Sequence, residues 1–152
     1  MEKRLFNILR NICFLLMLAM VVITFTQVVA RYVFSNSLSW SEEAGRYIFV
    51  WMTFLGAVMA VRNRQHVYLD MFVKILPNIL QKICALVSYL SMMIFTAVLI
   101  YGGFKFVARG SQQISSAMEI PMHYVYLVLP VGGILIFAYL LRNFYEDVLA
   151  RR

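Results

Sequence analysis

The sequence predicts an all-α membrane protein with four transmembrane helices and one short amphipathic helix in the membrane interface. Two observations predict this class. Apolar residues make up 62% of the 152 residues and charged residues only 14%, whereas a soluble domain has about 25% charged residues. In addition, four long stretches carry few or no charges and approach the roughly 20 residues that a helix needs to cross the hydrocarbon. Most of the apolar surface must therefore face lipid, or a partner within the membrane.

We expect the whole chain, residues 1–152, to form one integral membrane domain. The four predicted spans cover about residues 12–34, 42–61, 79–104 and 120–142. The second span holds Arg46 near its start, where a long basic side chain can extend to the interface. The first span is too long for the core of a typical secretory signal, and no small-x-small cleavage site follows it. We therefore expect it to be retained.

The distribution of Lys and Arg predicts the orientation. Ten of these 14 residues lie on one side: before the first span, between the second and third spans, after the fourth, or at the adjoining span ends, as Lys82 and Arg142 do. The positive-inside rule places this side in the cytoplasm, so both termini are expected there. Cys13 and Cys84 then lie near the cytoplasmic ends of their spans, where thiols stay reduced. The net charge of +7 is thus a topology signal, and no nucleic acid partner is expected.

A polar segment precedes the second span. Ser39 and Glu42 have the spacing of a capping box, and Glu42 and Glu43 are close enough to Arg46 for pairing on one helix face. Trp40 is expected at the headgroup level. A capped helix start and a docking surface for a partner both fit this pattern, whereas catalysis would need a nucleophile and base that the segment lacks. The docking candidates are Arg31, Ser39, Trp40, Glu42, Glu43 and Arg46.

The predicted interfacial helix covers about residues 62–77. Arg62, His66, Asp70 and Lys74 recur every four residues among mainly apolar neighbours. On a helix this makes a narrow polar stripe on a wide apolar body. Such a helix lies in the interface plane or packs beneath a partner. A proton relay through His66 and Asp70 is the less favoured alternative.

We expect no catalytic residue, metal site or cofactor. A haem between His66 and His123 is disfavoured, because the predicted topology separates them by roughly the 30 Å of the hydrocarbon. The spans hold only scattered hydroxyls in their interior and no buried pair of acids. Small residues and proline are instead expected to serve helix packing and bending. These candidates are Gly56, Ala60, Pro130, Gly132 and Gly133.

Several motifs together carry a family resemblance. They are Arg31-Tyr32-Val33-Phe34, Leu38-Ser39-Trp40-Ser41-Glu42-Glu43, Arg46-Tyr47-Ile48-Phe49-Val50-Trp51, Phe54-Leu55-Gly56-Ala57, His66, and Tyr124-Val125-Tyr126-Leu127 with Pro130-Val131-Gly132-Gly133. The set resembles the small membrane subunit of tripartite ATP-independent periplasmic (TRAP) transporters. The resemblance implies a bacterial or archaeal cytoplasmic membrane and a large permease subunit that carries the sodium and substrate sites. It also implies a soluble binding protein that delivers an organic acid.

With this resemblance, we expect a non-catalytic scaffold subunit, and the resemblance implies that it serves a sodium-driven importer of organic acids. Its expected partners are the large permease subunit, the periplasmic binding protein and membrane lipids. Two alternatives remain open, a membrane anchor of a redox enzyme complex and a small homo-oligomeric exporter. The substrate also remains open among dicarboxylates, sialic acid, other sugar acids and keto acids.

Overall fold

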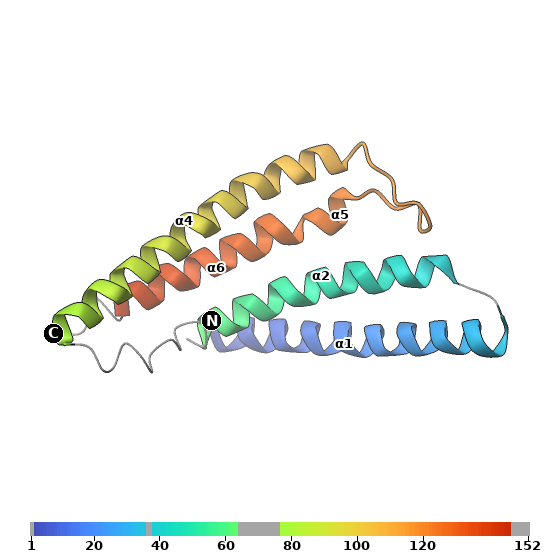
Figure 1. Ribbon diagram of the computed structural model, residues 1–152, viewed down its shortest axis with the longest axis horizontal. Coiled ribbons are helices and arrows are strands. Elements are labelled where there is room, and N and C mark those ends of the chain that lie inside the picture. Colours follow the sequence, from blue (N-terminus) through green and yellow to red (C-terminus); the bar gives the residue numbers. More distant parts are fainter. Residues whose placement is uncertain (1, 36–37, 64–76, 147–152) are drawn as a thin grey trace.

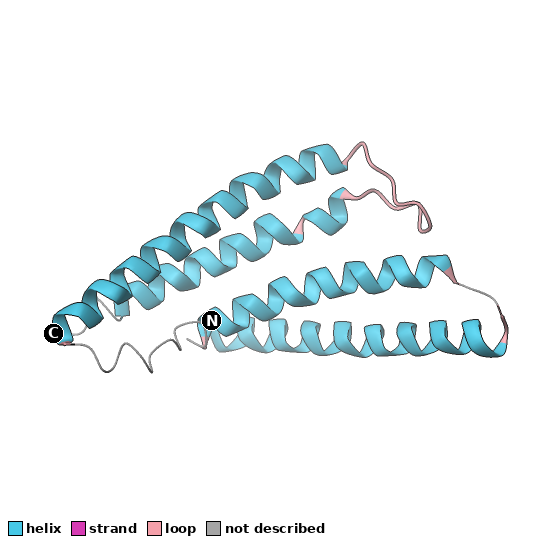
Figure 2. Ribbon diagram, viewed as in Figure 1, coloured by secondary structure: helices cyan, strands magenta, loops and turns pink. Residues whose placement is uncertain are grey.

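The computed structural model describes residues 2–35, 38–63 and 77–146. Its elements are α1 (Glu2–Val33), α2 (Ser39–Arg62), α4 (Asn78–Gly110), α5 (His123–Tyr126) and α6 (Val128–Phe144) (Figures 1 and 2). Four of the helical segments are long and apolar enough to cross a membrane, with α5 and α6 together making the fourth. The prediction of an all-α membrane protein with four spans is confirmed.

Two helices extend beyond the apolar runs that predicted them. α1 begins at Glu2, ten residues before the expected start, and α4 continues six residues past the expected end to Gly110. They contain 32 and 33 residues, or about 50 Å of helix, against roughly 30 Å of hydrocarbon. Hydropathy marks only the part of a helix that meets lipid, and backbone hydrogen bonding continues beyond that part. In α1 no proline or glycine interrupts it.

The predicted interfacial helix falls largely outside the described residues. Arg62 is the last residue of α2, whereas His66, Asp70 and Lys74 are not among the described positions. At the end of α2, the Arg62 guanidinium lies 3.8 Å from the centre of the Phe6 ring of α1. This cation–π contact fixes the end of α2 beside the start of α1.

The helices form two hairpins, which meet edge to edge. The first hairpin is α1 with α2, and the second is α4 with α5 and α6 (Figure 1). The extensive contacts join α1 to α2, α2 to α6 and α6 to α4. The four spans are therefore ordered α1–α2–α6–α4 in a row, in which the α6 span is the most buried and the α1 span the least. Most of the surface of the two edge helices is left to lipid or a partner.

The core lies toward one end of this row. We name the end with the start of α1 and the end of α6 the terminal end. The opposite end, with the end of α1, the start of α2 and the 111–122 loop, is the loop end. The core cluster takes residues from all four spans, nearly all from their terminal halves. Its members are Leu9, Leu55, Val58, Val61, Tyr89, Tyr139 and Leu140. The hairpins diverge from there toward the loop end (Figure 1).

Pro130 explains the interruption of the fourth span. Proline has no N–H to donate to the carbonyl four residues before it, which belongs to Tyr126, and its ring crowds that carbonyl. α5 accordingly ends at Tyr126 and α6 begins at Val128. The loop drawn between the two segments in Figure 2 marks this break.

The small residues expected to serve helix packing differ in their surroundings. A Cβ on Gly132 would lie 3.3 Å from Phe54 Cβ of α2, and one on Gly133 would lie 2.7 Å from Ile100 Cγ1 of α4. Both glycines thus let α6 approach its neighbours closely. A Cβ on Gly56 would meet no atom within 4 Å among the described residues, so the expected close contact is not seen at that position. Ala60, one turn further on, is half-buried.

Candidate partner-docking site at the loop end

The start of α2 differs from the predicted capping box. α2 begins at Ser39 with Leu38 as its N-cap, and no side chain caps it. Because Ser39 already has helical geometry, it stands one position too late to act as the N-cap. The serine that bonds here is Ser41, which is buried and donates its hydroxyl to the Leu38 carbonyl at 2.6 Å. The capping-box prediction was therefore wrong.

Glu43 bonds to a loop that is distant from it in the sequence. Glu43 is 9% exposed as a residue, and its carboxylate is held by the 111–122 loop. The backbone N–H groups of Ser116, Ala117 and Met118 donate to it at 3.2, 3.1 and 3.1 Å, and the Ser115 hydroxyl donates to Glu43 Oε2. Hydrogen bonds to an ionised acceptor are roughly twice as strong as neutral ones. We name this set of four contacts the Glu43 clasp.

The expected pairing of the two glutamates with Arg46 is not formed. In the described part of the chain, the structure gives no ion pair between Arg46 and Glu42 or Glu43. The loop donors hold the Glu43 carboxylate, while Arg46 and Glu42 are both exposed. A helix-surface pair gains only about 0.2–0.5 kcal/mol, so charge-assisted bonds from three backbone N–H groups easily outcompete it.

The loop is shaped to present those donors. Ser115 N–H donates to the Ile120 carbonyl at 2.9 Å, and Met122 N–H donates to the Gln113 carbonyl at 2.9 Å. These bonds close a short turn, in which Glu119 has a φ of 54°. Within the turn, successive N–H groups face one point and form a concave anion site of the type called a nest. The nest holds the carboxylate of this same chain.

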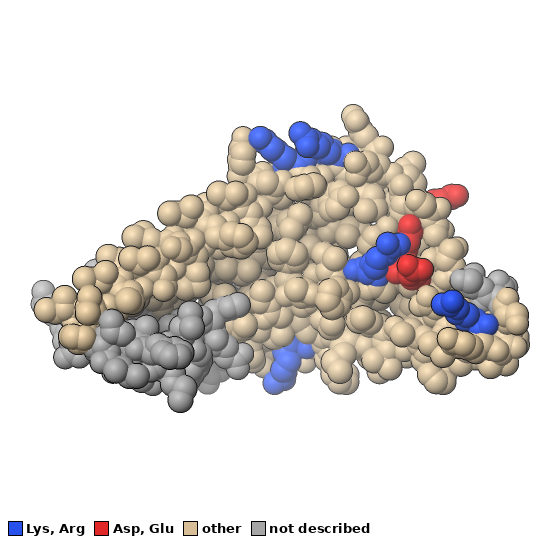
Figure 3. Space-filling model, in the orientation of Figure 1, with Lys and Arg blue, Asp and Glu red and all other residues tan. Residues whose placement is uncertain are grey.

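The remaining docking candidates lie around the Glu43 clasp. Arg31 is exposed near the end of α1, and Ser39, Trp40, Glu42 and Arg46 are exposed on the first turns of α2. On the face shown in Figure 3, the visible acidic side chains lie toward the loop end. The structure thus brings the six candidates to one end, with five of them exposed and Glu43 turned into the loop.

Three threonine hydroxyls of the spans are occupied within their own helices. Thr26, Thr53 and Thr96 each donate to the backbone carbonyl four residues earlier, at 2.8, 2.8 and 2.7 Å. This local bonding satisfies a hydroxyl in an apolar setting. These three threonines therefore do not converge on a common point within the described spans.

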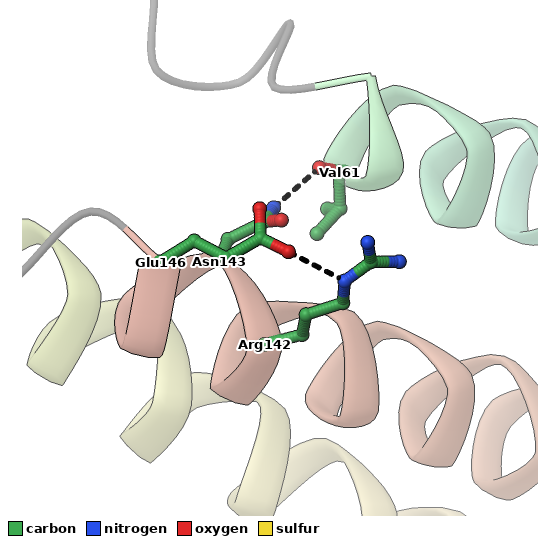
Figure 4. Close-up of polar contacts among 4 residues, drawn as sticks. All are labelled: Val61, Arg142, Asn143 and Glu146. Carbon is green, nitrogen blue, oxygen red and sulfur yellow. Dashed lines mark hydrogen bonds and ion pairs between the residues drawn. The ribbon is translucent and has the colours of Figure 1, made fainter. Parts of the chain in front are cut away.

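At the terminal end, a side-chain hydrogen bond joins the two hairpins in addition to the shared apolar core. Asn143 of α6 is 5% exposed and donates its amide to the Val61 carbonyl of α2 at 2.9 Å (Figure 4). The last carbonyls of a helix have no partner within it, and Asn143 supplies one. Beside it, Arg142 and Glu146 form an exposed pair at 2.8 Å. The sequence analysis did not predict the Asn143 contact, although a lone amide at the end of an apolar span was a signal for it.

His123, the second histidine of the haem hypothesis, lies at the start of α5 at the loop end. Its ring lies 4.1 Å from the ring of Tyr124. The other histidine of that hypothesis, His66, is outside the described residues. The expectation that no haem lies between the two histidines therefore stays a prediction.

The fold and this site define a multi-pass membrane protein with a polar loop end. Comparison with known proteins gives its family. Residues 20–150 match the family described as tripartite ATP-independent periplasmic transporters, DctQ component. The chain belongs to this family, so it is a TRAP transporter small permease subunit of the inner membrane and is not an enzyme.

Individual relatives agree with this assignment. A protein of Haemophilus influenzae assigned to the same subunit class is 31% identical over 140 residues, which are 92% of this chain and 87% of that protein. The sialic acid TRAP transporter small permease protein SiaQ of Vibrio cholerae is 25% identical over 88% of this chain and 78% of its own. The sialic acid TRAP transporter permease protein SiaT of H. influenzae is 29% identical over 79% of this chain, but the match covers only 20% of that protein. A segment similar to this chain thus also occurs within a longer permease protein.

Proposed function

We propose that this protein is the scaffold subunit of a sodium-driven importer of organic acids that depends on a soluble binding protein. In this proposal it supports the large permease subunit and helps to dock the binding protein. Both termini lie in the cytoplasm, and the loop end faces the periplasm. The positive-inside distribution of Lys and Arg supports this orientation.

The observation that carries the scaffold role is the open row of helices. A carrier of an organic acid needs donors for the anion and oxygen ligands for the cation near the midplane. Here the spans lie in the order α1–α2–α6–α4, and a row encloses no central pathway. The three threonine hydroxyls described above bond within their own helices. The pathway is therefore assigned to the large subunit.

The proposed substrate class follows from the relatives. Their names refer to C4-dicarboxylate, sialic acid and isethionate. The first two carry carboxylates and the third a sulfonate, so all three are organic anions. We therefore propose an organic acid as the substrate of the complex that contains this chain.

The test is reconstitution in liposomes with a sodium gradient. This chain alone should show no uptake of C4-dicarboxylate, sialic acid or isethionate, and uptake of one of them should appear when the large subunit and its binding protein are added. Uptake by this chain alone would support a self-contained transporter instead. Full uptake by the large subunit and the binding protein without this chain would contradict the proposed scaffold role.

A further inference from the structure

The two hairpins are joined differently at their two ends. At the terminal end they share an apolar core and the Asn143–Val61 bond. At the loop end, where they diverge, the described contacts between them include the Glu43 clasp and a bond from the Tyr47 hydroxyl to Met122 Sδ at 3.3 Å. Figure 1 shows the 111–122 loop curling toward the start of α2. The loop belongs to the second hairpin, whereas its main polar anchor belongs to the first.

The Glu43 clasp joins several consecutive loop residues to a single carboxylate. One carboxylate receives bonds from Ser115, Ser116, Ala117 and Met118, four consecutive residues. The Ser115 hydroxyl also accepts a bond from Met118 N–H at 3.3 Å. Removing the carboxylate would therefore release the whole turn together.

We propose that Glu43 is a positioning residue, which fixes the 111–122 loop against the start of α2 so that a soluble protein meets one rigid surface built from both hairpins. This inference rests on the proposed docking of a binding protein at the loop end. The physical reason is preorganisation, because a loop that is already ordered loses less conformational freedom when a partner binds. The exposed candidates Arg31, Trp40 and Arg46 then touch the partner, and Glu43 acts through the loop.

The experiment compares Glu43→Gln with Glu119→Gln, each in the complete complex with its permease and binding protein. Glu119 lies in the same loop and is exposed, so its substitution removes the same charge without touching the clasp. A spin label at Ser116, in a background without Cys13 and Cys84, reports loop motion. Sodium-driven uptake at increasing concentrations of loaded binding protein reports docking.

We expect Glu43→Gln to increase the mobility of the label and to raise the half-saturating concentration of binding protein several-fold, with a nearly unchanged maximal rate. Glu119→Gln should change neither quantity. A mobile loop with unchanged half-saturation would overturn the inference, as would an unchanged loop. Failure of the wild-type complex to require this chain or the binding protein would instead refute the proposed function, and it is measured first.

A second variant covers the case in which Glu43→Gln does not assemble. Glu43→Cys combined with Ala117→Cys can be joined by a short bis-maleimide, which restores the link without the carboxylate. Cross-linking should lower the half-saturating concentration back toward the wild-type value. If the cross-linked complex docks no better than the unlinked one, the positioning role of Glu43 is wrong.

Discussion

Replacing Gly103 by alanine should weaken the contact between α4 and α6. A Cβ at this position would lie 2.9 Å from Pro130 Cδ, 3.0 Å from Leu129 Cβ and 3.0 Å from the Pro130 nitrogen. Ordinary contacts between carbon atoms are about 3.5–4.0 Å, and neither a proline ring nor a backbone atom can rotate away. The two helices must therefore separate by several tenths of an ångström, and such overpacking costs about 1–3 kcal/mol.

The neighbouring glycine provides a matched control. A Cβ on Gly102 would meet no atom within 4 Å among the described residues, so Gly102→Ala should be neutral or slightly stabilising. In helices of soluble proteins, replacing glycine by alanine gains roughly 0.5–1 kcal/mol. The two variants should thus differ by about 1.5–4 kcal/mol, or on the order of 3–15 °C in Tm on the scale of soluble domains of this size.

The assay is thermal unfolding of the purified protein in a mild detergent, followed by circular dichroism. Gly103→Ala should unfold at a lower temperature than the wild type, and Gly102→Ala at the same or a slightly higher temperature. If Gly103→Ala were as stable as Gly102→Ala, the close approach of α4 and Pro130 would not exist in the protein.

Three further predictions follow from the described contacts. Asn143→Leu removes the amide that donates to the Val61 carbonyl and should destabilise the protein by about 1–3 kcal/mol in the same unfolding assay; an unchanged Tm would refute the link between the hairpins. In a cysteine-free background, a cysteine at Ser116 should react with an impermeant thiol reagent added outside cells, and one at Asn63 should not, whereas the reverse pattern would invert the proposed orientation. Arg46→Gln should leave Tm unchanged, because no ion pair to Glu42 or Glu43 is lost, yet it should reduce uptake by the complex. A clear loss of stability would show that Arg46 is a structural residue.

Hydropathy was sufficient to predict the fold class, and it was less informative about helix ends. The spans appear as long apolar runs because lipid contact selects apolar side chains all around a helix. The extensions of α1 to Glu2 and of α4 to Gly110 were not predicted, since these turns lie where polar side chains are tolerated. Pro130 was expected to bend the fourth span, and the position of the break at Leu127 follows from the missing N–H of proline.

Local spacing was misleading at the start of α2. Ser39, Glu42, Glu43 and Arg46 have the spacings of a capping box and of helix ion pairs, and the structure forms neither arrangement. Both predictions assumed that a polar side chain bonds to its nearest partner along the chain. The competing donors belong to residues 115–118, more than 70 positions away. Most of them are backbone N–H groups, and since nearly every residue has one, the sequence does not show which of them will meet a carboxylate.

The sequence by itself determined the membrane class, the number of spans, the motifs of the family and the gathering of polar residues beside the start of the second span. These properties depend on composition and on residues that are close together in the sequence, so they do not depend on how the helices pack. The tertiary structure alone decided that the helices stand in the row α1–α2–α6–α4, that Gly132 and Gly133 mark close contacts while Gly56 does not, and that Glu43 holds a distant loop. Each of these depends on which surfaces meet in three dimensions. Since nearly every face of these helices is apolar, hydrophobic patterning could not select those neighbours, and close packing with a few buried hydrogen bonds selected them instead.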